Sequence, residues 1–223
     1  DEIPLANEDG RNQTALKWLR EERGTGTAPE VTETDSGVIL RGNGFTYAYS
    51  RKSGLFESLR YAGREYLDRP MELNLWRAPT DNDMYVKPAW EKACYREAYT
   101  SARGTVVERY KDRVVIRGNL SVLAASVQRI MDVGAVWTVD NGGGIRCALE
   151  VCKNGEFPEL PRFGVRLFLD NRLCNVSYYG YGPMESYRDK HRAASHGLYR
   201  CGIEELHEDY IRPQENGSRF DCD

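Results

Sequence analysis

The feature that most constrains the fold of this chain is a series of short stretches in which apolar residues occupy every second position. The alternation begins after Ser36, runs through residues 38–40 and 45–49, and is typical of strands that bury one face. Glycines separate the stretches, and Gly42-Asn43-Gly44 has the composition of a hairpin turn. About ten to twelve short strands of this kind predict an all-β fold, an antiparallel β-sandwich.

One short helix is expected, from Pro88 to Ala98. Proline suits the first turn of a helix, and Trp90, Cys94 and Ala98 follow at a spacing of four. Residues 191–199 are ambiguous. Strands are also expected over residues 55–61, 64–67, 105–110, 114–120, 121–131, 135–139, 145–151, 163–169 and 173–178.

The chain divides unevenly. Residues 1–36 resemble a linker or the tail of a preceding domain, because Asn7–Gln13 is polar throughout and Gly24–Pro29 interrupts any regular element. Residues 37–223 are expected to form a single domain, a size that can bury a substantial core.

Charge and cysteine content narrow the functional classes. The net charge of −3 gives no strong field toward nucleic acid or an anionic membrane. No apolar run is long enough to span a bilayer, and the N-terminal residues lack the features of a signal peptide. Six scattered cysteines and three histidines argue against a metal site. These observations favour a cytoplasmic protein with reduced thiols.

A polar loop follows the apolar alternation of residues 71–75. Within Leu75–Asp83, Pro79 is expected to end the strand, and Asp81 and Asn82 favour a tight turn. A polar loop that leaves a rigid sheet is a common position for binding groups. The alternative is a surface turn that binds nothing.

Four stretches of sequence together carry a resemblance to a known family. They read approximately W-R-A-P-x-D-N-D, L-P-R-x-G, G-x-G-P-x-E-x-Y-x-D and P-x-E-N-G-x-R, in this order. They lie within Trp76–Asp83, Leu160–Gly164, Tyr178–Lys190 and Tyr210–Arg219. In this order they resemble the C-terminal domain of the large bacterial β-galactosidases of glycoside hydrolase family 2. The resemblance implies a two-sheet antiparallel supersandwich, similar to galactose mutarotase and incomplete at its C-terminal end.

The resemblance also implies where the chemistry lies. A retaining glycosidase needs two carboxylates about 5–5.5 Å apart, and in the family these belong to an upstream α/β barrel. The present chain has no repeated strand–helix pattern, so no residue is expected to be catalytic and the chain alone should be inactive. The implied partners are that barrel and a β-galactoside such as lactose. Magnesium and sodium are expected only in the full-length enzyme, which is also a possible homo-oligomer.

Two groups of residues follow from the motifs. In the resembling enzymes the first loop borders the sugar site, so Arg77, Asp81, Asn82, Asp83 and Tyr85 are substrate-binding candidates. Tyr85 replaces a glycine found in some relatives. The alternative is that Arg77 and the aspartates pair with each other and fix the loop. The candidate structural residues are Trp76, Gly182, Pro183, Glu185, Pro213, Glu215, Asn216 and Gly217.

The carboxylates of the later motifs have several interpretations. Glu185 and Glu215 are expected to pair with arginines, for which the candidates are Arg188, Arg212 and Arg219. A catalytic pair formed by the two glutamates is the sharper alternative. A mutarotase-like isomerase, which would need a histidine such as His191 or His196 acting with a glutamate, and a stand-alone carbohydrate-binding module also stay open.

Overall fold

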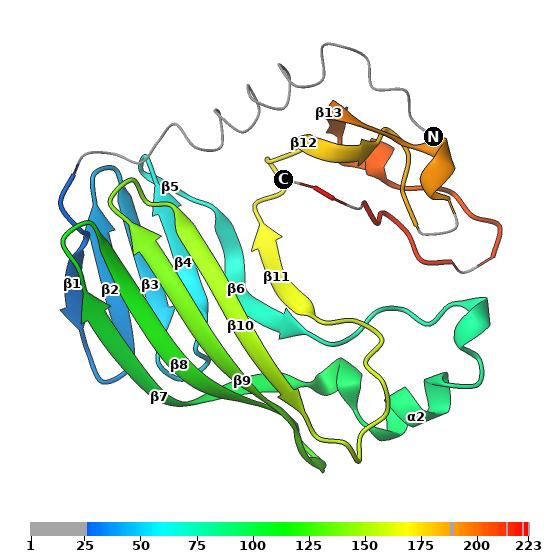
Figure 1. Ribbon diagram of the computed structural model, residues 1–223, viewed down its shortest axis with the longest axis horizontal. Coiled ribbons are helices and arrows are strands. Elements are labelled where there is room, and N and C mark those ends of the chain that lie inside the picture. The colour runs from blue at the N-terminus through cyan, green and yellow to red at the C-terminus, as the bar shows by residue number, and fades with distance from the viewer. Residues whose placement is uncertain (1–25, 188–189, 213, 220, 223) are drawn as a thin grey trace.

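The computed structural model describes residues 26–187, 190–212, 214–219 and 221–222. Antiparallel strands account for most of this part of the chain, which confirms the predicted all-β sandwich (Figure 1). None of the helices in these residues has the length and apolar character needed to span a bilayer.

The first layer is a five-stranded sheet in the order β1-β2-β3-β4-β5, flanked by the two-stranded pair β6–β11. The alternation that the sequence predicted is clearest in β3, where every second side chain is buried in the core and the side chains between them are partly buried. The strands are β1 (Glu30–Glu33), β2 (Gly37–Gly42), β3 (Phe45–Ser50), β4 (Phe56–Tyr61), β5 (Arg64–Glu65), β6 (Leu67–Asn74) and β11 (Gly164–Leu169). β1 lies inside the stretch expected to be a linker, and its pairing with β2 makes it part of the sheet.

The second layer is a four-stranded sheet in the order β10-β9-β8-β7. Its strands are long: β7 (Tyr99–Arg109), β8 (Arg113–Ala124), β9 (Val127–Asp140) and β10 (Ile145–Lys153). The expected division of β8 at residue 120 is wrong. The turn instead falls at Ala125 and Ser126, which lack the glycine, proline or asparagine that signals a turn.

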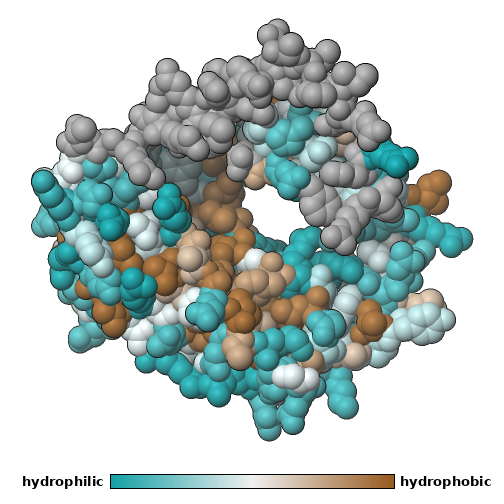
Figure 2. Space-filling model, viewed as in Figure 1, coloured by the Kyte–Doolittle hydropathy of each residue, from teal (hydrophilic) through white to brown (hydrophobic). Residues whose placement is uncertain are grey.

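The core lies between these two layers. Phe56 from the first layer packs edge-on against Trp137 from the second, with ring centroids 5.3 Å apart. The Trp137 indole N–H donates to the carbonyl of Gly54 at 3.3 Å, so the one polar atom of this ring is satisfied. The core is less well covered at one side, where Leu167 and Leu169 of β11 are about half exposed. Figure 2 shows apolar residues gathered beside an opening in this face.

Short helical segments connect the layers. The expected helix from Pro88 to Ala98 is interrupted: η1 (Asp81–Asp83) is followed by α2 (Lys87–Lys92) and η2 (Tyr95–Glu97). The break falls at Cys94, whose φ of 54° is left-handed and ends the helical path.

A second unit follows β11. β12 (Asn175–Gly182) pairs with β13 (Ser195–Gly202), with η3 (His191–Ala193) between them and η4 (Glu204–Leu206) after them. The ambiguous stretch 191–199 is therefore a short helical turn followed by a strand. Among the described residues of this unit, none belongs to the main apolar core, and the polar motifs supply several of its contacts with the sandwich.

Candidate functional site

The site begins where β6 ends. The Asn74 side chain accepts a hydrogen bond from the Trp76 backbone N–H at 3.2 Å and donates to the Trp76 carbonyl at 2.9 Å. These two hydrogen bonds turn the chain out of the sheet, and the Arg77 side chain then points toward the following helical turn, η1. The strand β6 therefore ends at a side-chain turn at Asn74, five residues before Pro79, where the sequence predicted its end.

Arg77 and Asp83 form a two-pronged ion pair. The two guanidinium nitrogens lie 2.5 and 2.9 Å from the two carboxylate oxygens, and the side chains are only 17% and 11% exposed. The Arg77 hydrogen bond holds the pKa of Asp83 below its ordinary value, against the opposing effect of burial. The Thr80 backbone N–H also donates to Asp83, at 2.7 Å. The hypothesis that Arg77 pairs within the loop is correct for Asp83.

The segment that contains L-P-R-x-G is fixed through its backbone carbonyls. Tyr95 donates to the Pro158 carbonyl at 2.7 Å, Trp90 to that of Glu159 at 2.9 Å and Arg77 to that of Pro161 at 3.2 Å. Three side chains from the loop and the helical turns therefore hold one irregular segment. Such a segment forms no ladder of its own, so these bonds satisfy its acceptors.

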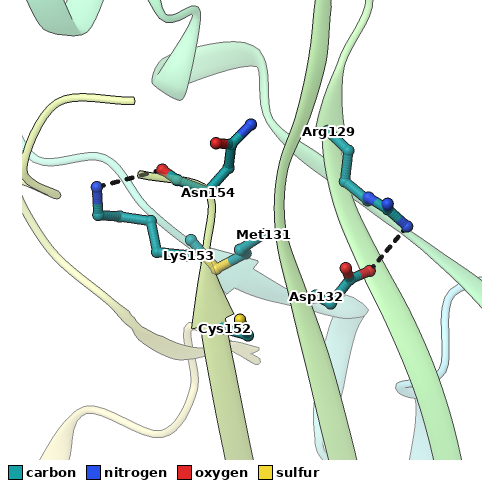
Figure 3. A pocket seen from close by; sticks show the side chains of 6 residues that line it. All are labelled: Arg129, Met131, Asp132, Cys152, Lys153 and Asn154. Atoms are coloured by element: carbon teal, nitrogen blue, oxygen red, sulfur yellow. Dashed lines mark hydrogen bonds and ion pairs between the residues drawn. The ribbon is translucent and has the colours of Figure 1, made fainter. Parts of the chain in front are cut away.

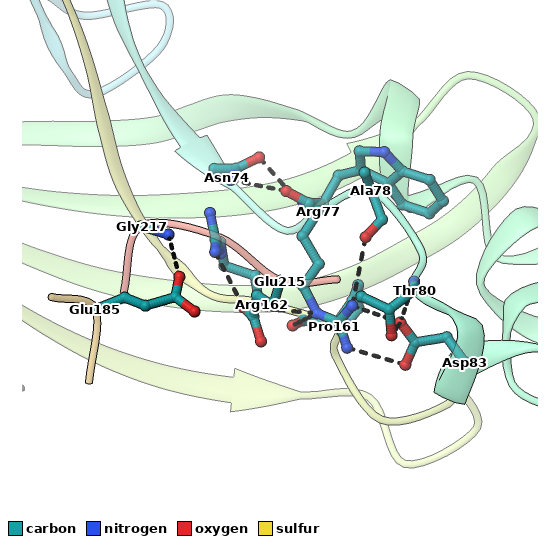
Figure 4. Close-up of polar contacts among 11 residues, drawn as sticks. Asn74, Arg77, Ala78, Thr80, Asp83, Pro161, Arg162, Glu185, Glu215 and Gly217 are labelled. Atoms are coloured by element: carbon teal, nitrogen blue, oxygen red, sulfur yellow. Dashed lines mark hydrogen bonds and ion pairs between the residues drawn. The ribbon is translucent and has the colours of Figure 1, made fainter. Parts of the chain in front are cut away.

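Glu215 joins the C-terminal segment to this assembly. Its carboxylate accepts from the Arg162 guanidinium at 3.1 Å and lies 3.9 Å from Nε of Arg77 (Figure 4). An arginine partner was expected for Glu215, and the candidates were Arg188, Arg212 and Arg219. The arginines that Glu215 contacts are instead Arg162 and Arg77. Arg212 instead lies 4.0 Å from Asp81.

Glu185 is the most deeply buried carboxylate of the site, at 3% exposure. Its oxygens accept from Nζ of Lys190 at 2.9 Å and from the Gly217 backbone N–H at 3.1 Å. The prediction of an arginine partner is therefore wrong for Glu185 within the described residues. A lysine five residues along the same motif, together with a backbone amide, provides the compensation that a buried carboxylate requires.

The other C-terminal motif residues have structural contacts as well. Asn216 bridges the backbone of Glu208, accepting at 3.2 Å and donating at 2.6 Å. Arg219 donates to the Pro183 carbonyl and to the Tyr178 hydroxyl. Gly182 is buried, and a Cβ there would meet the Tyr178 hydroxyl at 2.4 Å. The motif residues outside the described part of the chain are Pro213, Arg188 and Asp189.

The five substrate-binding candidates divide into two groups. Arg77 and Asp83 are engaged inside the loop, whereas Asp81, Asn82 and Tyr85 are exposed at its tip, and Tyr85 is 87% exposed. The start and end of the loop are therefore held together by the Arg77–Asp83 ion pair, and its exposed tip carries polar and aromatic side chains.

His196 does not lie with these carboxylates. Its ring packs edge-on against Tyr179 and Tyr181 of β12, with centroids 4.5 and 5.2 Å apart, and its Nε2 lies 3.2 Å from the Asp221 carbonyl. Among the described residues, no glutamate is paired with His196, as a mutarotase-like site would require.

Comparison with known proteins identifies the family of this chain. A family model described as "Beta galactosidase small chain" matches residues 41–223. The chain belongs to this family. It is 34% identical to a β-galactosidase of Actinobacillus pleuropneumoniae over 194 residues, which are 87% of the chain and 19% of that relative. A β-galactosidase of Lactobacillus delbrueckii subsp. bulgaricus is 33% identical over 86% of the chain and 19% of its own length. The chain spans about a fifth of the curated β-galactosidases that it matches.

Each of the four motifs of this small-chain domain supplies a group to one polar assembly. We call it the motif junction; it consists of Arg77, Asp83, Arg162, Glu185 and Glu215 (Figure 4). Sequence reasoning identified the motifs but missed three of the side chains around the junction. Trp90 was missed because it was interpreted only as an apolar helix residue. Tyr95 was not considered, and Lys190 was missed because Glu185 and Glu215 were assigned to arginines.

A separate pocket lies at the ends of β9 and β10 (Figure 3). Its lining contains an Arg129–Asp132 ion pair at 3.2 Å and no residue of the junction. The lining residues are Arg129, Met131, Asp132, Cys152, Lys153 and Asn154. Within the described residues, no group of three or more histidine, cysteine, aspartate or glutamate side chains is arranged to hold a metal ion.

Proposed function

We propose that this chain is a non-catalytic domain of a larger β-galactosidase, in which it supports the catalytic barrel and borders the sugar site. The larger enzyme would hydrolyse terminal β-D-galactosides such as lactose with retention, in the cytoplasm, and would hold its magnesium and sodium at the barrel. The observation that carries the proposal is the match to the small-chain family by a chain that spans about a fifth of its relatives.

The state of the carboxylates supports the non-catalytic part of this proposal. A glycosidase needs one carboxylate available as nucleophile and a second as acid and base. Glu185 is paired with Lys190, and Glu215 lies against two arginines. Both carboxylates are therefore paired with cations, which supports a structural role for them rather than a catalytic one.

The rim role is proposed for the tip of the first loop. Asp81 and Asn82 offer the planar donors and acceptors that read sugar hydroxyls, and Tyr85 offers an aromatic face beside them. All three are exposed, and the Arg77–Asp83 pair fixes the base of the loop. A tip held in place before substrate arrives loses little conformational entropy on contact.

The rim role can be tested in the full-length enzyme. Tyr85→Ala is expected to raise KM for a chromogenic β-galactoside about five- to tenfold, the loss of one aromatic contact, with little change in stability. Tyr110→Ala is the matched control, because Tyr110 is 44% exposed in the β7–β8 turn and should leave KM unchanged. An unchanged KM in Tyr85→Ala would remove Tyr85 from the rim.

A stand-alone carbohydrate-binding module is the second candidate. The observation that favours it is the ring cluster of Tyr179, Tyr181 and His196, because sugar-binding faces use aromatic side chains. Calorimetric titration of the chain with galactose or lactose separates the two functions. The domain proposal expects weak or no binding, whereas low-micromolar binding favours the module. Polarimetry on α-galactose tests a mutarotase activity in the same preparation.

A further inference from the structure

The stretch of chain that carries Tyr85 is held at both of its ends. On its N-terminal side, Asp83 is 8% exposed and accepts from the Arg77 guanidinium at 2.5 and 2.9 Å. On its C-terminal side, Trp90 of α2 is 6% exposed, whereas Tyr85 between them is 87% exposed. Buried neighbours two and five positions away therefore limit where the exposed ring can lie.

Trp90 is fixed by a hydrogen bond to a distant part of the chain. Its indole N–H donates to the Glu159 carbonyl at 2.9 Å, across 69 positions of sequence. That carbonyl belongs to the irregular segment between β10 and β11, which passes beside α2 in Figure 1. The N–H is the only polar group of a buried indole ring, so this bond satisfies the ring and also sets its orientation.

Arg77 contacts both ends of the stretch. Its guanidinium pairs with Asp83, and its Cζ lies 5.3 Å from the centroid of the Trp90 ring. A guanidinium at this distance from an indole ring is attracted by the negative face of the ring. The Arg77 Nε also donates to the Pro161 carbonyl, two residues beyond the acceptor of Trp90. Both ends of the stretch are therefore tied to the same segment between β10 and β11.

This segment has a second attachment just after α2. The Tyr95 hydroxyl donates to the Pro158 carbonyl at 2.7 Å, and the Tyr95 ring stacks on Phe157 with centroids 6.4 Å apart. Of the two attachments, Trp90 is the one nearer in sequence to Tyr85. Loss of the Trp90 bond should therefore release the loop tip more directly than loss of the Tyr95 bond.

We propose that Trp90 is a positioning residue for the rim of the sugar site, because it holds Tyr85 where its aromatic face can meet a bound β-galactoside. This inference rests on the rim role proposed above for Tyr85. Trp90 acts through the backbone of its own helical turn, in which the N–H groups of Ala89 and Trp90 both donate to the Val86 carbonyl. Loosening Trp90 gives Tyr85 more conformations, and ordering them again on binding weakens the affinity for substrate.

Trp90→Phe tests this role in the full-length enzyme. Phenylalanine keeps an aromatic ring but has no N–H group to donate to the Glu159 carbonyl. KM for a chromogenic β-galactoside should rise about threefold while kcat stays within about twofold, because the ordering of a binding group is affected and the chemistry is not. In a Tyr85→Ala background, Trp90→Phe should leave KM unchanged, because the residue through which Trp90 acts is gone.

Amide hydrogen exchange measures the position of the tip without substrate. The Val86 N–H donates to the Asp83 carbonyl and the Trp90 N–H to the Val86 carbonyl. Both amides should exchange about tenfold faster in Trp90→Phe, since local opening of this turn becomes easier. This measurement does not depend on the rim role.

Trp137→Phe is the matched control. Trp137 is 2% exposed and its indole N–H donates to the Gly54 carbonyl at 3.3 Å, so the variant loses an equivalent bond in the core of the sandwich. It should lower the stability of the domain. It should leave KM and the exchange of residues 86–90 unchanged, because Trp137 lies away from the loop.

Three results would overturn the inference while the rim role stands. The first is a KM that rises in Tyr85→Ala but not in Trp90→Phe. The second is a rise in KM for Trp90→Phe that is equal with and without Tyr85, or that Trp137→Phe reproduces. The third is unchanged exchange of residues 86–90 in Trp90→Phe. An unchanged KM in Tyr85→Ala alone would remove the rim role, and the inference with it, whatever the exchange rates show.

Discussion

Asp83→Asn removes the charge at the centre of the loop while keeping the shape of the side chain. Asp83 accepts from Arg77 at 2.5 and 2.9 Å and from the Thr80 N–H at 2.7 Å, and both members of the ion pair are mostly buried. Breaking a fully buried pair costs about 3–5 kcal/mol. Because Arg77 retains some contact with water and Asn retains one acceptor, we expect a loss of about 2–3 kcal/mol.

Thermal unfolding measures this loss. For a chain of this size each kcal/mol shifts Tm by about 2–4 °C, so Asp83→Asn should lower Tm by about 4–12 °C. Asp112→Asn is the matched control. Asp112 pairs with Arg113 at 3.0 Å, but the two side chains are 60% and 44% exposed, and surface pairs contribute little. Equal Tm values for Asp83→Asn and the parent would refute the claim that this pair fixes the loop.

The same pair predicts a pH dependence. The folded pKa of Asp83 lies below its ordinary value of 3.8, so an unfolded chain binds this proton at a higher pH than the folded one. The contribution of Asp83 to stability is therefore complete above about pH 5 and is lost as the pH falls through the depressed pKa. The difference in unfolding free energy between the parent and Asp83→Asn should shrink below about pH 4. A difference that is constant down to pH 2 would contradict the assignment.

Three further substitutions have expected outcomes. Glu65→Gln should cost about 1–2 kcal/mol in chemical denaturation, because this carboxylate accepts hydrogen bonds from three backbone N–H groups. Burial by itself would raise the pKa of Glu65, and these hydrogen bonds lower it below its ordinary value. Trp137→Ala should cost about 3–5 kcal/mol in the same assay, because it opens a cavity in the centre of the sandwich. Glu185→Gln should speed amide exchange over 214–219 about tenfold, since it weakens the bond to Gly217 and removes the charge facing Lys190; unchanged exchange would show that Glu185 does not hold this segment.

The strands were predictable where one face is buried. In β2 and β3 the apolar period of two matches the buried positions, and Gly44, with φ of 81°, supplies the turn that the sequence indicated. β1 was not predictable, because a four-residue edge strand with exposed glutamates carries no alternation. The interruption at Cys94 was hidden for a similar reason, since a helical spacing of four does not reveal a left-handed residue within it.

The motif residues were predictable but their pairing was not. Glu185 meets Gly217 from 32 positions away, and Trp90 meets the Glu159 carbonyl from 69 positions away. Such contacts depend on how the layers pack, which a single sequence specifies only through the complete fold. Residue type restricted the choice to a cation for each carboxylate, and tertiary structure then selected Lys190 for one and Arg162 for the other.

The most direct test of the central claim is the hydrolysis of a chromogenic β-galactoside by the purified 223-residue chain, measured beside the full-length enzyme at equal molar concentration. If the catalytic carboxylates belong to the barrel, the chain alone gives the rate of the buffer blank. Turnover that Glu185→Gln or Glu215→Gln abolishes would instead place the chemistry in this domain and contradict the account.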